Sequence, residues 1–172
     1  MERKIYTIGE TLFDIIFKNG QPQAGKAGGA MLNSSVSLGR IGLPVHLISE
    51  YGDDDIGSII DNFLKGNGVS TQFADHFKEG NTALAIAVLN EKNDASYTFY
   101  KNYPSRRFEM DFPQIRKDDI ILCGSIYAIT REIRQKFVGF VSGAAAAGAV
   151  VLYDPNFRKA HASELDELRP LI

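Results

Sequence analysis

The chain has 172 residues, 44% of them hydrophobic and 23% charged, which is typical of a globular protein with room for a sizeable core. The formal net charge of −2 argues against a nucleic-acid partner, which requires a basic excess. A single cysteine, Cys123, excludes a disulfide within the chain and favours a reducing, cytoplasmic location, and no apolar stretch reaches the roughly 20 residues of a membrane span.

The first part of the chain alternates between strand and helix patterns. Residues 4–9 predict an apolar strand, and residues 12–25 predict a hairpin around an Asn-Gly pair, the favoured dipeptide for a two-residue turn. A helix is expected over 30–39, and a second buried strand over 44–52.

The clearest helix pattern begins after the acidic triplet 53–55. These carboxylates are interpreted as caps for the free N–H groups of the first turn rather than as a metal site. Apolar residues then recur at i, i+3, i+4, i+7 and i+8, so one buried stripe is expected, formed by Ile56, Ile59, Ile60, Phe63 and Leu64.

The second half of the chain repeats this alternation. Residues 82–104 predict another hairpin, 118–125 a buried strand, 133–145 a helix and 149–156 a further buried strand. A last helix is expected to begin at Ser163.

Buried strands that alternate with helices predict an α/β fold in three layers, with a parallel sheet covered on both faces. The two hairpins do not fit this pattern and are expected to form a separate small antiparallel sheet. The parallel sheet is short of the usual number of strands, so we expect the chain to be the front part of a longer protein.

Asp14 is a lone carboxylate in an otherwise apolar strand, "TLFDIIF". A charge in such a place is costly unless it has partners. Either the side chain turns to solvent, or it accepts hydrogen bonds from a polyol, because one carboxylate can bind two vicinal hydroxyls.

Gly28 and Gly29 stand directly before a helix, and Asn33 follows one turn later. The glycines are interpreted either as an ordinary loop or as a place where the backbone approaches a ligand closely. Asn33 either caps the helix or binds a ligand hydroxyl through its amide. The spacing fits neither G-x-G-x-x-G nor a phosphate-binding P-loop.

A polar elbow, "DPNFR", follows the last buried strand. Its Asp154 can cap the loop, and its Arg158 can hold a phosphate or another substrate oxygen through the forked guanidinium. The three histidines show no metal-ligand spacing, so no metal site is predicted.

The order of these motifs resembles the ribokinase-like (PfkB) carbohydrate kinases over nearly the whole chain. The most specific part is "GKAGGAMLNSSVSLGRIG", in which Met31 departs from the small residue or proline of the family signature. The segments "SYTFYKN" and "DPNFR" are most similar to fructokinases. The resemblance implies a three-layer ribokinase-like domain, with residues 1–172 as its N-terminal part and the hairpins 12–25 and 82–104 as its β lid.

The resemblance also implies ATP-dependent transfer of phosphate to a sugar hydroxyl, with Mg²⁺ as the metal. It assigns the sugar site to Asp14, Gly28, Gly29 and Asn33, with Phe99 packing on the sugar and Arg158 near the sugar or its phosphate. The family's catalytic base is an aspartate in a Gly-Ala-Gly-Asp segment, which this sequence lacks. We therefore expect the base beyond Ile172 and predict that the chain alone is inactive.

Three alternatives stay open at this stage. The acceptor can be 2-keto-3-deoxygluconate or a nucleoside instead of fructose, or the chain can be a non-catalytic sugar-binding domain. A homodimer through the lid sheet is also plausible, because exposed strand edges and an apolar face need cover.

Overall fold

The computed structural model describes residues 3–156 and residue 166. The predicted helix at Ser163 and the predicted site residue Arg158 lie outside the described residues.

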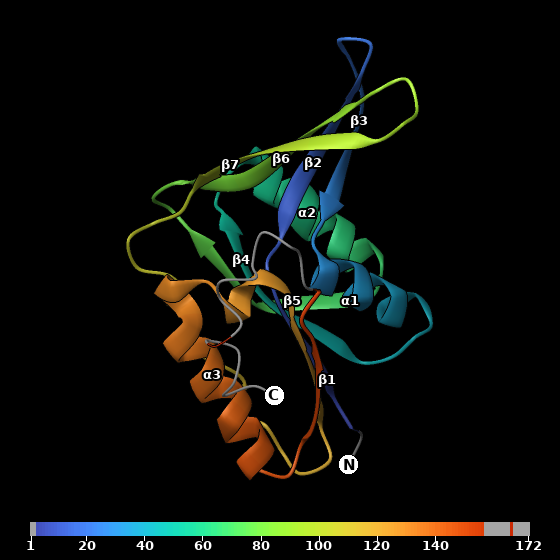
Figure 1. Cartoon of the computed structure of the whole chain (residues 1–172). Helices are drawn as coiled ribbons and strands as arrows, with labels where there is room; N and C mark the ends of the chain where they lie inside the picture. Colours follow the sequence, from blue (N-terminus) through green and yellow to red (C-terminus); the bar gives the residue numbers. More distant parts are fainter. Residues whose placement is uncertain (1–2, 157–165, 167–172) are drawn as a thin grey trace.

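A five-stranded, fully parallel sheet forms the centre of the molecule, with the strand order β5-β4-β1-β8-β9 (Figure 1). Its strands are β1 (Ile5–Ile8), β4 (Val45–Gly52), β5 (Val69–Phe77), β8 (Ile120–Gly124) and β9 (Val150–Asp154).

Helices cover both faces of this sheet, as predicted. α1 (Ala30–Arg40) and α2 (Asp55–Gly66) pack with β1 and β4 in one hydrophobic core. α3 (Arg131–Ala146) packs with β1 and β8 in a second core, beside a short 3-10 helix, η1 (Ser125–Ala128). The three-layer α/β/α arrangement is therefore confirmed.

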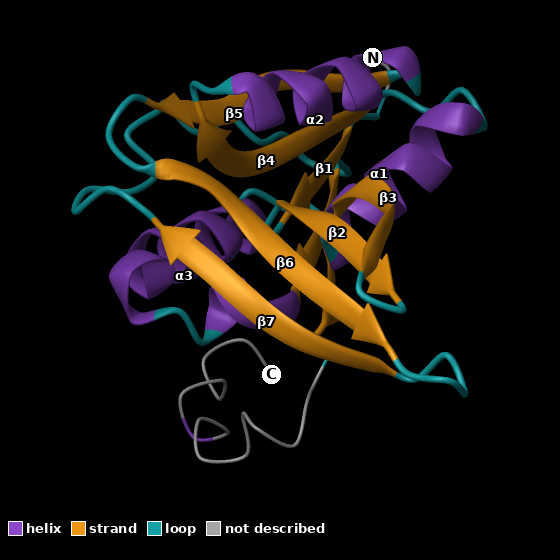
Figure 2. Cartoon of the chain, turned by 90° about the horizontal axis from the view of Figure 1, so that it is seen from above, coloured by secondary structure: helices purple, strands orange, loops and turns teal. Residues whose placement is uncertain are grey.

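A second, four-stranded sheet crosses one end of the parallel sheet, in the order β3-β2-β6-β7 (Figure 2). It is built from the two predicted hairpins, β2 (Leu12–Lys18) with β3 (Gln21–Gly28), and β6 (Asn81–Leu89) with β7 (Ala95–Asn102). The expectation of an antiparallel sheet is only partly right. Each hairpin is antiparallel, but β2 and β6 pair in parallel, so the sheet is mixed.

Local chemistry explains the boundaries of these elements. Asn19 and Gly20 both have positive φ, which a tight turn between β2 and β3 requires. Asp54 is the N-cap of α2, and its Oδ1 accepts a hydrogen bond from the Gly57 N–H at 2.7 Å. The interpretation of the acidic triplet as a helix start is thus confirmed.

Two expectations about the region around α2 are wrong. Ile60 and Leu64 are fully buried, whereas Ile59 and Phe63 are exposed, so the buried stripe is narrower than predicted. Strand β5 has no counterpart in the sequence prediction. It is an edge strand with mixed burial and polar residues, so it lacks the apolar run that marks the inner strands.

Candidate functional site

The carboxyl end of β1 leads directly into the four-stranded sheet. Ser49 of β4 donates a hydrogen bond to the Gly9 carbonyl at 2.8 Å, and its hydroxyl lies 2.6 Å from that of Thr11. These contacts fasten the link between β1 and β2 to the neighbouring parallel strand. Ligands of open α/β sheets bind outside the carboxyl ends of the strands, so this junction is the first place to search for a site.

Asp14 and Gly28 lie side by side at this junction. A Cβ atom built on Gly28 would collide with Asp14 Oδ2, and it would also press on the Leu12 side chain. Burial raises the pKa of Asp14 above its usual value, while the positive charge of Lys26, opposite it on β3, acts in the other direction. The structure therefore brings two of the predicted site residues together. The positive charge of Lys26 does not fully offset the cost of burying the Asp14 carboxylate.

Gly29 and Asn33 belong to the start of α1. Gly29 is the N-cap with φ of 120°, and a Cβ there would collide with the Glu10 carbonyl. No side chain caps this helix end through a hydrogen bond. Asn33 is exposed in the first turn of α1, and its backbone N–H donates to the Gly29 carbonyl at 3.0 Å.

Phe99 shares one face of the four-stranded sheet with Asp14. Asp14 pairs with Ala85 of β6, and Ala85 pairs with Phe99 of β7. Paired residues point to the same face, and two strand spacings separate Asp14 from Phe99 by about 10 Å. Phe99 is 55% exposed and stacks on Tyr97, with 6.1 Å between the ring centroids.

A polar network beside this face was not predicted from the sequence. Glu10 Oε1 accepts hydrogen bonds from Lys101 Nζ at 2.6 Å and from the Tyr103 hydroxyl at 3.0 Å. The guanidinium of Arg107 lies over the Tyr103 ring, 3.7 Å from its centroid, and forms a buried ion pair with Glu50. The hydrogen-bonded partners of Glu10 and Glu50 in this network lie 57 to 93 residues away in the chain, so no local motif reveals these pairs.

This network borders a cavity of about 330 Å³ next to the α3 N-terminus. It is lined by Glu10, Lys101, Tyr103, Pro104, Arg107, Thr130 and Glu132. Positive and negative side chains both line it, which suits a ligand with hydroxyl groups better than one with a large net charge.

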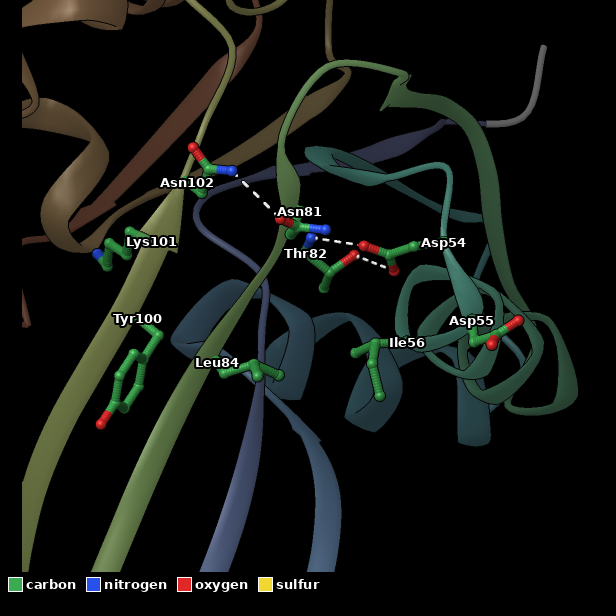
Figure 3. Close-up of a pocket in the computed structure, with 9 residues that line it drawn as sticks. All are labelled: Asp54, Asp55, Ile56, Asn81, Thr82, Leu84, Tyr100, Lys101 and Asn102. Carbon is green, nitrogen blue, oxygen red and sulfur yellow. Dashed lines mark hydrogen bonds between the residues drawn. The ribbon is translucent and has the colours of Figure 1, made fainter.

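A larger cavity of about 510 Å³ lies on the other face of the four-stranded sheet (Figure 3). Leu84 and Tyr100 line it, and each is next in its strand to Ala85 or Phe99, so their side chains point away from Asp14. Asp54 borders this cavity, but its carboxylate is occupied by Thr82, which donates from its N–H at 2.8 Å and from its hydroxyl at 2.7 Å. None of the residues predicted for the sugar site lines this cavity.

The described residues contain neither a candidate metal cluster nor a membrane-spanning helix. No group of three or more His, Cys, Asp or Glu side chains lies close enough together to hold a metal ion. No helix in that part of the chain is long and apolar enough to cross a membrane.

The fold is a three-layer α/β/α domain with an additional four-stranded sheet, and comparison with known proteins identifies its family. Residues 2–172 match the family described as "pfkB family carbohydrate kinase". The chain belongs to the PfkB family of carbohydrate kinases, as its resemblance indicates.

Curated relatives include a probable fructokinase-6 of Arabidopsis thaliana, 33% identical over 76% of this chain and 35% of its own length. Fructokinase-2 of Zea mays is 31% identical over 76% of this chain and 40% of its own length. The chain thus spans well under half the length of the curated relatives named here.

Solved structures show the same fold. Fructokinase from Xylella fastidiosa aligns with a TM-score of 0.80 and 26% identity, covering 96% of this chain and 58% of that one. An uncharacterized sugar kinase from Pyrococcus horikoshii aligns with a TM-score of 0.81 and 21% identity, covering 97% of this chain and 60% of that one.

Proposed function

We propose that this chain forms the acceptor-sugar half of an ATP-dependent, fructokinase-like sugar kinase. The single observation that carries the proposal is that the Asp14 carboxylate occupies the space that a side chain at Gly28, the last residue of β3, would need. In this proposal the carboxylate accepts hydrogen bonds from two sugar hydroxyls. Because Gly28 has no side chain, the carboxylate has room to occupy this position.

The neighbouring residues complete the pocket in this proposal. The bare backbone of Gly29 and the exposed amide of Asn33 offer donors and an acceptor to further hydroxyls. Phe99 supplies an apolar surface for the C–H face of the sugar ring, on the same sheet face as Asp14. We assign Arg158 to the sugar or its phosphate on the family resemblance alone, because it lies outside the described residues.

The four-stranded sheet acts as a lid over this pocket, built from the hairpins of β2–β3 and β6–β7. Two crystal structures named in the comparisons support ATP as the phosphate donor: the Pyrococcus horikoshii sugar kinase and the Xylella fastidiosa fructokinase were each solved with ATP. Phosphoryl transfer depends on positioning and charge stabilisation. The Gly-Ala-Gly-Asp segment that would supply the base does not occur in the 172 residues, so the chain by itself binds sugar without turning it over.

The proposal is tested by ADP release with ATP, Mg²⁺ and a panel of acceptors. The panel contains D-fructose, D-glucose, D-ribose, 2-keto-3-deoxygluconate and a nucleoside, and it is run on the chain and on the whole product of its gene. Turnover of D-fructose by the whole product supports the proposal. A different preferred acceptor reassigns the substrate, and no sugar-dependent turnover contradicts the kinase function and favours a sugar-binding module.

We also infer a homodimer through the lid sheet. β3 and β7 are its edge strands, and several large side chains are exposed on β6 and β7, namely Val88, Tyr97, Phe99 and Tyr100. A second copy can cover these edges and rings. Light scattering at micromolar concentration tests it, and a monomer under all conditions contradicts it.

We place the chain in the cytoplasm in this proposal, because its single cysteine cannot form a disulfide within the chain. Cys123 is fully buried, and burial raises the pKa of its thiol to about 12, so it has little thiolate character.

A further inference from the structure

Glu10 contacts both sides of the proposed sugar pocket. Its backbone carbonyl lies where a side chain at Gly29 would have to go, so it fixes the approach of α1. Its side chain, which is almost fully buried, binds Lys101 and Tyr103 at the exit of β7. One residue after β1 therefore joins the glycine side of the pocket to the lid.

Lys101 links Glu10 to the aromatic side chains of the lid. Lys101 Nζ lies 2.6 Å from Glu10 Oε1 and 5.5 Å from the centroid of the Phe99 ring. Phe99 in turn stacks on Tyr97. Residues 97, 99 and 101 alternate along one strand, so all three point to the same face as Asp14.

The charges explain why Glu10 matters for this arrangement. A lysine side chain has about four rotatable bonds, and an exposed ammonium gains little from a ring unless something else holds it. The nearly buried Glu10 carboxylate supplies that anchor, because a buried charge demands its partner. Without Glu10, Lys101 is free to extend into solvent, and Phe99 loses one of the neighbours that limit its rotation, while Tyr97 remains.

We propose that Glu10 is a positioning residue of the sugar pocket, which acts through Lys101 to order Phe99 and so sets the affinity for the sugar. This inference rests on the proposed function of the Asp14 site. Glu10 itself is not assigned a contact with the sugar or a role in phosphate transfer.

The first experiment is independent of any ligand. In the NMR spectrum of the 172-residue chain, the ε-methylene protons of Lys101 should be shifted upfield by the ring current of Phe99. Glu10→Gln should abolish this shift, as should Phe99→Leu, while Lys92→Met in the turn between β6 and β7 should leave it unchanged. A shift that persists in Glu10→Gln overturns the proposal.

The second experiment measures sugar affinity with D-fructose as the probe. Glu10→Gln and Lys101→Met should each weaken binding about threefold to tenfold, the cost of ordering a side chain or two on binding. The double variant should be no weaker than either single one, because both remove the same contact.

The outcomes separate this inference from the proposed function. If the unaltered chain binds no D-fructose, the proposed function fails, and the ring-current measurement alone decides whether Glu10 orders Phe99. If D-fructose binds equally well to the unaltered chain and to both single variants, the positioning role fails while the sugar site stands.

Discussion

The Asp14 carboxylate fills the space that a side chain at Gly28 would need, so an aspartate in this position requires a glycine at residue 28. The two residues lie diagonally across the β2–β3 hairpin, where Gly28 pairs with Leu12 and Asp14 pairs with Lys26. An Asn-Gly turn closes this hairpin, and α1 begins two residues after Gly28. The position of the acid therefore explains the glycine, and under the proposed function the acid is explained by a sugar that binds its ionised form.

Gly28→Ala should displace the Asp14 carboxylate and abolish D-fructose binding. Overpacking of this kind also costs about 1–3 kcal/mol of stability, measurable by urea unfolding. The control is Gly143→Ala, an exposed position in α3 with open space around it, which should be neutral or stabilising by up to about 1 kcal/mol. Full D-fructose affinity in Gly28→Ala would contradict the pairing.

Asp14→Asn should remove sugar binding without lowering stability at neutral pH. The pKa of Asp14 is raised in the folded protein by burial, so ionisation there opposes folding, and stability rises as pH falls through that raised pKa. The asparagine removes this cost at pH 7. The melting temperature should stay equal or rise, and a large fall would show that the acid has a structural role instead.

The same raised pKa predicts that sugar affinity depends on pH. Binding requires ionised Asp14, so affinity should decline as pH falls toward the pKa of Asp14, which burial raises above its ordinary value. Calorimetric titration with D-fructose between pH 4 and 8 measures this. Affinity that stays constant to pH 4 would exclude Asp14 as the titrating group.

Asp54→Ala should destabilise the chain by about 1–2 kcal/mol at pH 7, because it removes the α2 N-cap. Burial opposes ionisation of Asp54, but hydrogen bonds from Thr82 and Gly57 outweigh it and hold its pKa below the usual value. The stabilisation is therefore present above the unfolded-state pKa and is lost as pH falls through the folded-state pKa. Urea unfolding at pH 7 and pH 2.5 should show the difference between variant and parent shrinking in acid.

The control for this prediction is Asp55→Ala. Asp55 is exposed in the first helical turn and interacts with the helix dipole, so its loss should cost about 0.3–1 kcal/mol. Equal effects of the two substitutions would show that the cap bonds of Asp54 contribute little.

Arg107→Met should cost about 3–5 kcal/mol, because it leaves the Glu50 carboxylate buried without its partner. The neighbouring Arg106→Met removes only an exposed ion pair with Glu109 and should change stability by less than about 1 kcal/mol. Unfolding in urea gives both values, and similar losses for the two arginines would contradict the buried pair.

The fold was largely predictable because buried strands and amphipathic helices leave periodic patterns. Strand β5 left none, since it is an edge strand with polar residues. The sequence also did not predict that Ile59 and Phe63 are exposed. Periodicity indicates which side of a helix faces the core, but not how many residues on that side are buried. The parallel pairing of β2 with β6 depends on how two distant hairpins meet, which no local pattern records.

The candidate site likewise contains residues that the sequence could indicate and residues that it could not. Asp14 and the glycine pair stand out as local anomalies, a charge in an apolar strand and flexible residues before a helix. Glu10 gave no such signal, because its partner Lys101 is 91 residues away and both look like ordinary surface charges in the sequence.

The most direct test of the sugar site is an amide NMR titration of the chain with D-fructose, repeated with Asp14→Asn. We predict saturable shifts at Gly28, Gly29, Asn33 and Phe99 that vanish in the variant. Shifts confined to the cavity around Thr82 and Tyr100, or no saturable binding of any sugar in the panel, would contradict the account.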